Sequence, residues 1–141
     1  MTKNELELLY KEKILPLNQD PYHFEVPEKY SSELKAYNPM CGDKFDIYLD
    51  LDKNKIKNIW FYGIGCAISK ASTSVLAKTL EGMEIVKARE LCGSFLDTLD
   101  EGKTGTFEIE ELAILVGLKD FDGRKDCIKL GWIALWRELG R

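Results

Sequence analysis

Two neighbouring stretches of the chain, residues 45–51 and 56–62, follow a two-residue period of side-chain character. The first alternates apolar and polar residues, and the second is more apolar throughout. This period is typical of β-strands with one buried face. The polar residues 52–54 between them suit a turn. We therefore predict an antiparallel hairpin over residues 45–62.

Elsewhere apolar residues recur every three to four positions, which indicates amphipathic helices. The first helix should end at Pro16, because proline disrupts a helix interior, and later helices should stop at Gly82 and Gly117. Residues 17–39 contain several prolines, so we expect an irregular segment with room for one short strand. The predicted helices cover residues 4–15, 67–80, 84–99, 108–117 and about 124–139.

The order of these elements, a helix, then strands, then helices, indicates an α+β fold. We expect a small antiparallel sheet of about three strands with the helices packed on one of its faces. A chain of 141 residues can bury about two-thirds of its unfolded surface around one core. Residues 1–141 are therefore expected to form a single domain.

Composition and charge exclude several classes of function. Hydrophobic residues make up 45% of the chain and charged residues 31%, which is typical of a folded globular protein. The net charge of −4 and the scattered lysines argue against nucleic acid as a partner. The N-terminus carries no apolar leader, and no apolar run approaches the roughly 20 residues that span a bilayer. We therefore expect no membrane association and a cytoplasmic location.

Two of the four cysteines lie in glycine-containing loops at the two ends of the predicted hairpin. Cys41 belongs to the sequence NPMCGD, which also supplies the carboxylate of Asp43, and Cys66 belongs to GIGCAIS. A hairpin returns the chain to its starting end, so the loops should be neighbours although the cysteines are 25 positions apart. The helix that follows Cys66 offers free N–H groups that favour a thiolate.

Zinc and iron both bind thiolates readily, and a tetrahedral site with three sulfurs and one oxygen is chemically reasonable. Cys127 is the natural third thiol, because it lies near the start of the last helix beside the cations Arg124 and Lys125. Cys92 has only helix-packing neighbours, so we interpret it as a buried core thiol.

Other possible signals are better explained by structure than by chemistry. Residues 100–111 resemble an EF-hand loop, but Gly102 and Thr104 replace two of its carboxylates. His23 is the sole histidine and is interpreted as a surface or packing residue. Trp132 and Trp136 are predicted to be core anchors of the last helix. Ser69, Ser72 and Ser74 are predicted to be polar helix surface and capping residues.

The segments NPMCGDKFDIYLDL, FYGIGCAISKASTSVL and RKDCIKLGW together resemble the IscU/SufU family of iron-sulfur cluster assembly proteins. The resemblance covers roughly residues 37–136, with the motifs in the same order and at similar intervals. In that family three cysteines and the aspartate of the Cys-Gly-Asp motif are metal ligands. The resemblance therefore implies that the metal ligands here are Cys41, Asp43, Cys66 and Cys127.

Within the family the chain is more similar to the SufU branch. Cys66 and Cys127 are 61 positions apart, which implies the SufU insertion, around residues 92–118. Asp126 stands where IscU proteins have a histidine, and residues 120–123 replace their Leu-Pro-Pro-Val-Lys chaperone motif. Residues 15–18 also depart from the usual Asp-His-Tyr pattern, so no role of that histidine is carried over.

The resemblance implies a zinc-dependent acceptor of persulfide sulfur from a SufS-type cysteine desulfurase. Cys41 would accept the sulfur, with Cys127 as the next candidate, and a downstream SUF scaffold or apo-proteins would receive it. A second hypothesis uses the same residues as a transient [2Fe-2S] scaffold. A third, from another class, is an interaction module with a purely structural zinc. Whether the protein acts as a sulfurtransferase enzyme stays open at this point.

Overall fold

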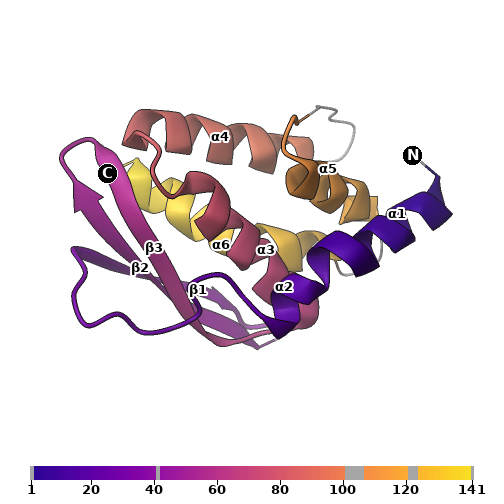
Figure 1. Ribbon diagram of the computed structural model, residues 1–141, viewed down its shortest axis with the longest axis horizontal. Helices are drawn as coiled ribbons and strands as arrows, with labels where there is room; N and C mark the ends of the chain where they lie inside the picture. Colours follow the sequence, from indigo (N-terminus) through magenta and orange to yellow (C-terminus); the bar gives the residue numbers. More distant parts are fainter. Residues whose placement is uncertain (1, 41, 101–106, 121–123, 141) are drawn as a thin grey trace.

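A computed structural model describes residues 2–40, 42–100, 107–120 and 124–140 of the chain (Figure 1). Three strands form the sheet: β1 (Ser32–Asn38), β2 (Asp43–Asp52) and β3 (Lys55–Ile64). The α-helices are α1 (Lys3–Leu9), α2 (Pro16–Gln19), α3 (Ala67–Leu80), α4 (Ile85–Thr98), α5 (Glu110–Gly117) and α6 (Arg124–Leu139). A π-helix, η1 (Tyr10–Ile14), joins α1 to α2, and a 3₁₀-helix, η2 (Leu118–Asp120), follows α5.

The sheet is antiparallel with the order β1-β2-β3. The predicted hairpin is confirmed, and it extends from Asp43 to Ile64. The short strand that we expected within residues 17–39 is β1, which pairs Asn38 with Asp43. Lys44 pairs with Ile64, so the beginning of β2 lies beside the end of β3. This register brings the two loops that flank the hairpin to one edge of the molecule.

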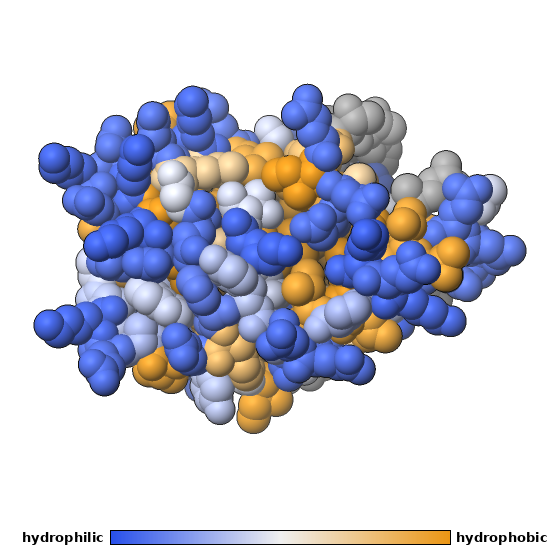
Figure 2. Space-filling view, in the orientation of Figure 1, coloured by the Kyte–Doolittle hydropathy of each residue, from blue (hydrophilic) through white to orange (hydrophobic). Residues whose placement is uncertain are grey.

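The helices pack on one face of the sheet, as predicted (Figure 1). Alternate strand residues point into the core, and Phe45, Ile47 and Phe61 are fully buried there. Trp132 of α6 is also fully buried, which confirms it as a core anchor. Hydrophilic residues cover much of the face seen in the space-filling view (Figure 2). None of the helices in the described ranges has the length and apolar character required to cross a membrane.

The prediction that Pro16 ends the first helix is wrong. The chain stays helical through α1, η1 and α2, from Lys3 to Gln19. In the π-helix the N–H of Leu15 donates to the carbonyl of Tyr10, five residues earlier, at 2.8 Å. Pro16 then occupies the first turn of α2, where a missing N–H costs nothing and the fixed φ angle suits a helix. A change of helix type therefore accommodates the proline.

The interpretation of the three α3 serines as polar surface is also wrong, because each is at most 1% exposed. Ser72 Oγ donates to the Ile128 carbonyl at 2.8 Å and accepts from Trp132 Nε1 at 3.1 Å. Ser74 Oγ accepts the N–H of Tyr22 at 2.6 Å. Because α3 is covered on several sides, small hydroxyl side chains serve there as internal hydrogen-bonding groups.

The interpretations of Cys92 and His23 agree with the structure, whereas Trp136, predicted as a core anchor, is only partly buried and packs against the core with Arg89 over its ring. Cys92 is fully buried, and burial raises the pKa of its thiol to about 12 despite the opposing effect of Arg89. His23 is a packing residue, stacked on Tyr22 and with Nδ1 3.0 Å from Glu81 Oε2. The EF-hand-like stretch falls largely on residues 101–106, outside the described residues, so the expectation about it stays a prediction.

Candidate metal centre

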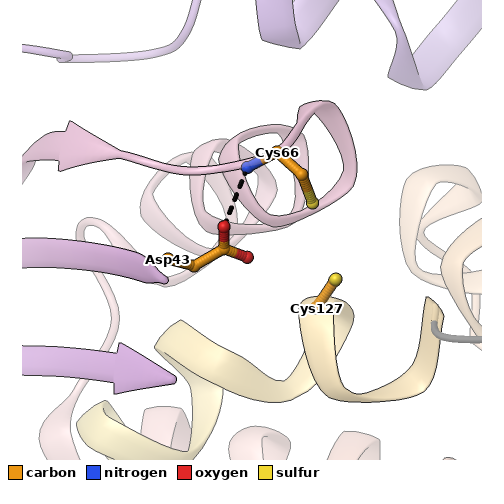
Figure 3. Close-up of side chains that lie close together, drawn as sticks. All are labelled: Asp43, Cys66 and Cys127. Carbon is orange, nitrogen blue, oxygen red and sulfur yellow. Dashed lines mark hydrogen bonds between the residues drawn. The ribbon is translucent and has the colours of Figure 1, made fainter. Parts of the chain in front are cut away.

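Three of the four residues implied as ligands converge from separate parts of the fold (Figure 3). Asp43 begins β2, Cys66 immediately precedes α3, and Cys127 lies in the first turn of α6. One carboxylate oxygen and the two sulfurs all lie within 4.8 Å of one another. Cys41, the fourth residue, lies outside the described residues. The sequence therefore identified a cluster that the fold assembles from positions up to 84 residues apart.

The hairpin holds Asp43 next to Cys66. Gly42 adopts a positive φ of 77°, which favours glycine and directs the chain from the preceding turn into β2. Gly63 allows β3 to approach β2 closely, since a Cβ there would lie 2.1 Å from the carbonyl oxygen of Lys44. Asp43 Oδ1 accepts the backbone N–H of Cys66 at 3.1 Å. These contacts confirm that the two loops are spatial neighbours.

Cys66 is the N-cap residue of α3, and its sulfur replaces the usual capping oxygen. Its Sγ accepts the backbone N–H of Ser69 at 3.4 Å. The first turn of a helix carries unpaired N–H groups and a partial positive charge, both of which favour an anionic sulfur. The prediction that this helix start faces the Cys66 sulfur is confirmed.

Cys127 reaches the site because α6 packs closely against α3. A Cβ at Gly131 would lie 3.0 Å from Thr73 Oγ1, so the glycine allows close approach of the two helices. The hydrogen bond from Ser72 to the carbonyl of Ile128 fixes α6 one residue beyond Cys127. Sequence reasoning missed Ser72 as a residue that supports the site. The shortage of charged residues in α3, with only Lys70 and Lys78, was the available signal that this helix is covered.

The buried carboxylate indicates what the cluster would bind. Asp43 is 4% exposed, and its Oδ2 has no hydrogen-bond partner among the described residues. A buried carboxylate oxygen without a partner is costly unless a cation or a donor meets it. Cys66 and Cys127 are both partly buried. Two thiolates and one carboxylate oxygen are suitable ligands for zinc or iron.

The spacing of the cluster is compatible with a tetrahedral metal. Zn–S bonds of about 2.3 Å place two sulfurs about 3.8 Å apart. The ligand atoms here lie within 4.8 Å, so side-chain adjustments of about 1 Å would complete the geometry. We conclude that the donor atoms fit a zinc ion and leave one coordination position for a further ligand.

Tyr10 is a second residue near the site that sequence reasoning did not single out. Burial raises the pKa of its hydroxyl, with an opposing contribution from Arg124 and a smaller raising contribution from Cys66. Tyr10 is the first residue of the π-helix, a feature that occurs frequently at functional sites. The helical spacing of Tyr10 with neighbouring apolar residues predicted only that it packs in the core. It could not predict the π-helix, because tertiary packing sets the local helix type.

The fold and the cluster define an α+β protein with a candidate metal centre, formed by one carboxylate and two cysteine sulfurs, at one end of its sheet. Residues 9–133 match the family described as NifU-like N terminal domain. Since this match spans most of the sequence, the chain belongs to that family, and the resemblance to IscU/SufU proteins is confirmed.

Two curated relatives and one solved structure illustrate the similarity. The zinc-dependent sulfurtransferase SufU of Bacillus subtilis (strain 168) is 30% identical over 96% of this chain and 92% of its own. The iron-sulfur cluster assembly scaffold protein IscU of Streptococcus pyogenes serotype M1 is 28% identical over 100% of this chain and 89% of its own length. A crystal structure from Fervidobacterium islandicum AW-1 is named as a proposed iron-sulfur cluster assembly scaffold protein for the SUF system. It matches with a TM-score of 0.81 and 27% sequence identity, and the match covers 94% of this chain and 98% of that one.

Proposed function

We propose that this protein works in iron-sulfur cluster assembly as a zinc-dependent acceptor of sulfur from a cysteine desulfurase. The observation that carries this proposal is the convergence of Asp43, Cys66 and Cys127, in a protein whose relatives include a zinc-dependent sulfurtransferase and cluster scaffolds. Zinc is the resident cofactor in this proposal. Any iron or [2Fe-2S] cluster is cargo.

The proposed zinc ligands are Cys41, Asp43, Cys66 and Cys127. Bound zinc keeps the sulfurs deprotonated at neutral pH while it masks their reactivity. Asp43 supplies a single hard oxygen among soft sulfurs, so its bond is the easiest to exchange. Cys41 is two residues before Asp43, next to Gly42, and is the proposed ligand for the remaining coordination position.

Sulfur transfer needs only thiol chemistry. The desulfurase carries a persulfide, and the thiolate of Cys41 attacks its terminal sulfur. A new S–S bond forms on Cys41 as the S–S bond of the desulfurase breaks. The enzyme cysteine leaves as a thiolate and takes up the proton of the transferred persulfide or one from solvent. No external oxidant or reductant is required, because one sulfur–sulfur bond replaces another.

Exposed apolar residues beside the site support docking of a protein partner. Met40 is 93% exposed and directly precedes Cys41, and Ile64 is 79% exposed two residues before Cys66. Tyr37 and Ile64 both pair with Lys44 in the sheet register, so the three share one row on one face of the sheet. We propose a SufS-type desulfurase as this partner, and a SUF scaffold or apo-proteins as recipients of the sulfur.

The transient [2Fe-2S] scaffold is the second candidate, and the IscU relative that aligns with the whole chain favours it. The same four side chains would bind the cluster. Transfer of a reconstituted cluster to an apo-ferredoxin would distinguish this function from sulfur acceptance. A purely structural zinc would permit neither cluster transfer nor stimulation of a desulfurase.

The test is desulfurase turnover with and without this protein under reducing conditions. We expect the SufS-type desulfurase of the same organism to produce alanine and sulfide faster when the protein is added, and Cys41→Ala to abolish the increase. Cys127→Ala, checked for retained fold, is the comparison. Stimulation that survives in Cys41→Ala but not in Cys127→Ala would move the acceptor role to α6. No stimulation by the wild-type protein would refute the transfer function.

A further inference from the structure

Ser69 is fully buried and contacts Cys66 in three ways. Its backbone N–H donates to Cys66 Sγ at 3.4 Å. Its hydroxyl oxygen lies 3.5 Å from the same sulfur and accepts the thiol proton there. The hydroxyl donates its own proton to the carbonyl oxygen of Cys66 at 3.1 Å. One side chain thus faces both the sulfur and the backbone of a proposed ligand.

We propose that Ser69 is a positioning residue that orients and tunes the metal-bound sulfur of Cys66. The proposal rests on the metal site proposed above. As a metal ligand, Cys66 would have lost its thiol proton, and its Sγ would then have only acceptor capacity. The Ser69 hydroxyl can then turn its proton from the carbonyl to the sulfur. The sulfur would accept two hydrogen bonds, one from the hydroxyl and one from the backbone N–H.

The surrounding residues hold this hydroxyl in place. A Cβ at Gly65 would lie 2.6 Å from Ser69 Oγ and 2.4 Å from the ring of Phe45, so only glycine leaves room for the hydroxyl. Thr73, in the next turn of α3, donates its hydroxyl proton to the Ser69 carbonyl at 2.8 Å. The position of the hydroxyl is therefore determined by packing, as required of a residue that orients a metal ligand.

A consequence concerns the division of roles among the thiols. Hydrogen bonds to a thiolate withdraw electron density from sulfur, which weakens it as a nucleophile and fixes its direction toward the metal. Cys66 should therefore remain the anchored ligand during the reaction. Sulfur acceptance then belongs to another thiol of the site, in agreement with the proposed role of Cys41.

The test uses cobalt(II) as a spectroscopic substitute for zinc. We expect Ser69→Ala to shift the sulfur-to-cobalt charge-transfer band to lower energy, because a sulfur without the hydroxyl hydrogen bond gives up an electron more easily. Zinc affinity, measured by competition with a chelating dye, should fall about tenfold or more. Ser69→Thr keeps the hydroxyl and should retain the wild-type band.

Ser74→Ala is the matched control, because Ser74 is equally buried in α3 but bonds to Tyr22 instead of a sulfur. It should leave the cobalt spectrum unchanged. A wild-type spectrum and zinc affinity in folded Ser69→Ala, or the same shift in Ser69→Thr or in Ser74→Ala, would overturn the role of Ser69. Absence of any sulfur-to-cobalt band in the wild-type protein would instead refute the metal site itself.

Discussion

Replacing Asp43 by asparagine separates the cost of burying its carboxylate from its proposed use as a metal ligand. Asp43 Oδ1 accepts the N–H of Cys66 at 3.1 Å, whereas Oδ2 is buried with no hydrogen-bond partner among the described residues. Asparagine has nearly the same shape and keeps an oxygen for that N–H, but it carries no charge. The substitution should therefore stabilise the metal-free protein and weaken the metal-bound one.

The two effects have opposite signs and similar sizes. A buried unsatisfied group costs about 1–3 kcal/mol and more when it is charged, and the neutral amide recovers part of this. We expect a gain of about 1–2 kcal/mol in the free energy of unfolding without metal, or roughly 3–8 °C in Tm. Loss of the anionic ligand should reduce zinc affinity about 10–100-fold, equivalent to about 1.4–2.8 kcal/mol.

Thermal unfolding in a chelator and in excess zinc measures both effects, and dye competition gives the affinity directly. Asp50→Asn is the control, since Asp50 lies on the same strand, opposite Asn58 and away from the site. It should change neither quantity appreciably. A metal-free Asp43→Asn protein that melts below the wild type would show that the carboxylate is stabilising without metal and would refute the predicted cost of its burial.

Three further predictions concern the thiols and the hydrogen bonds of Glu81. Metal analysis after dialysis should find that Cys41→Ala, Cys66→Ala and Cys127→Ala each lose most of their zinc, because these are the proposed ligand thiols. Cys92→Ala, which replaces the core thiol, should retain its zinc. Iodoacetamide at pH 8 should not modify Cys92 until the protein unfolds, because a pKa of about 12 leaves almost no thiolate. Modification of Cys92 in the folded protein, detected by mass spectrometry, would contradict this. Glu81→Ala should cost about 2–3 kcal/mol of stability with unchanged zinc affinity, because Glu81 accepts hydrogen bonds from Tyr22 Oη and from the Ile59 N–H; equal stability in a denaturant titration would contradict this.

Local patterns were sufficient to predict the hairpin and the convergence of its flanking loops. The two-residue period correctly marks Phe45, Ile47 and Leu49 of β2 as buried, whereas in β3 an irregularity opposite Asp50 and Leu51 breaks the period and buries both Ile56 and Ile59. A hairpin must also return the chain to its starting end. Asp43 and Cys66 could therefore be placed together from the sequence. α3 could be bounded at Ala67 and Leu80 because glycines flank it and its apolar residues recur at helical spacing.

The features that the sequence did not predict depend on contacts between distant segments. Burial of Ser72 follows from its partners Ile128 and Trp132, about 60 positions further on, and no local pattern contains that pairing. Pro16 remains helical only because the π-helix changes the hydrogen-bonding register before it. In both cases tertiary packing overrides the ordinary preference of the residue type.

The contacts that support the site bear on the choice between transfer and purely structural zinc. Asp43 is held to Cys66 by a hydrogen bond to the backbone, and α6 is held to α3 through Ser72 and the close approach at Gly131. All of these contacts join protein groups to one another, so they persist when a metal ligand exchanges. A zinc ion that only braced loops would supply that support itself, and its release would unfold the site. If zinc bound here, a centre whose ligands Asp43, Cys66 and Cys127 are positioned by the fold would keep its arrangement while one ligand exchanged, which favours the proposed sulfur-acceptor function over the structural one.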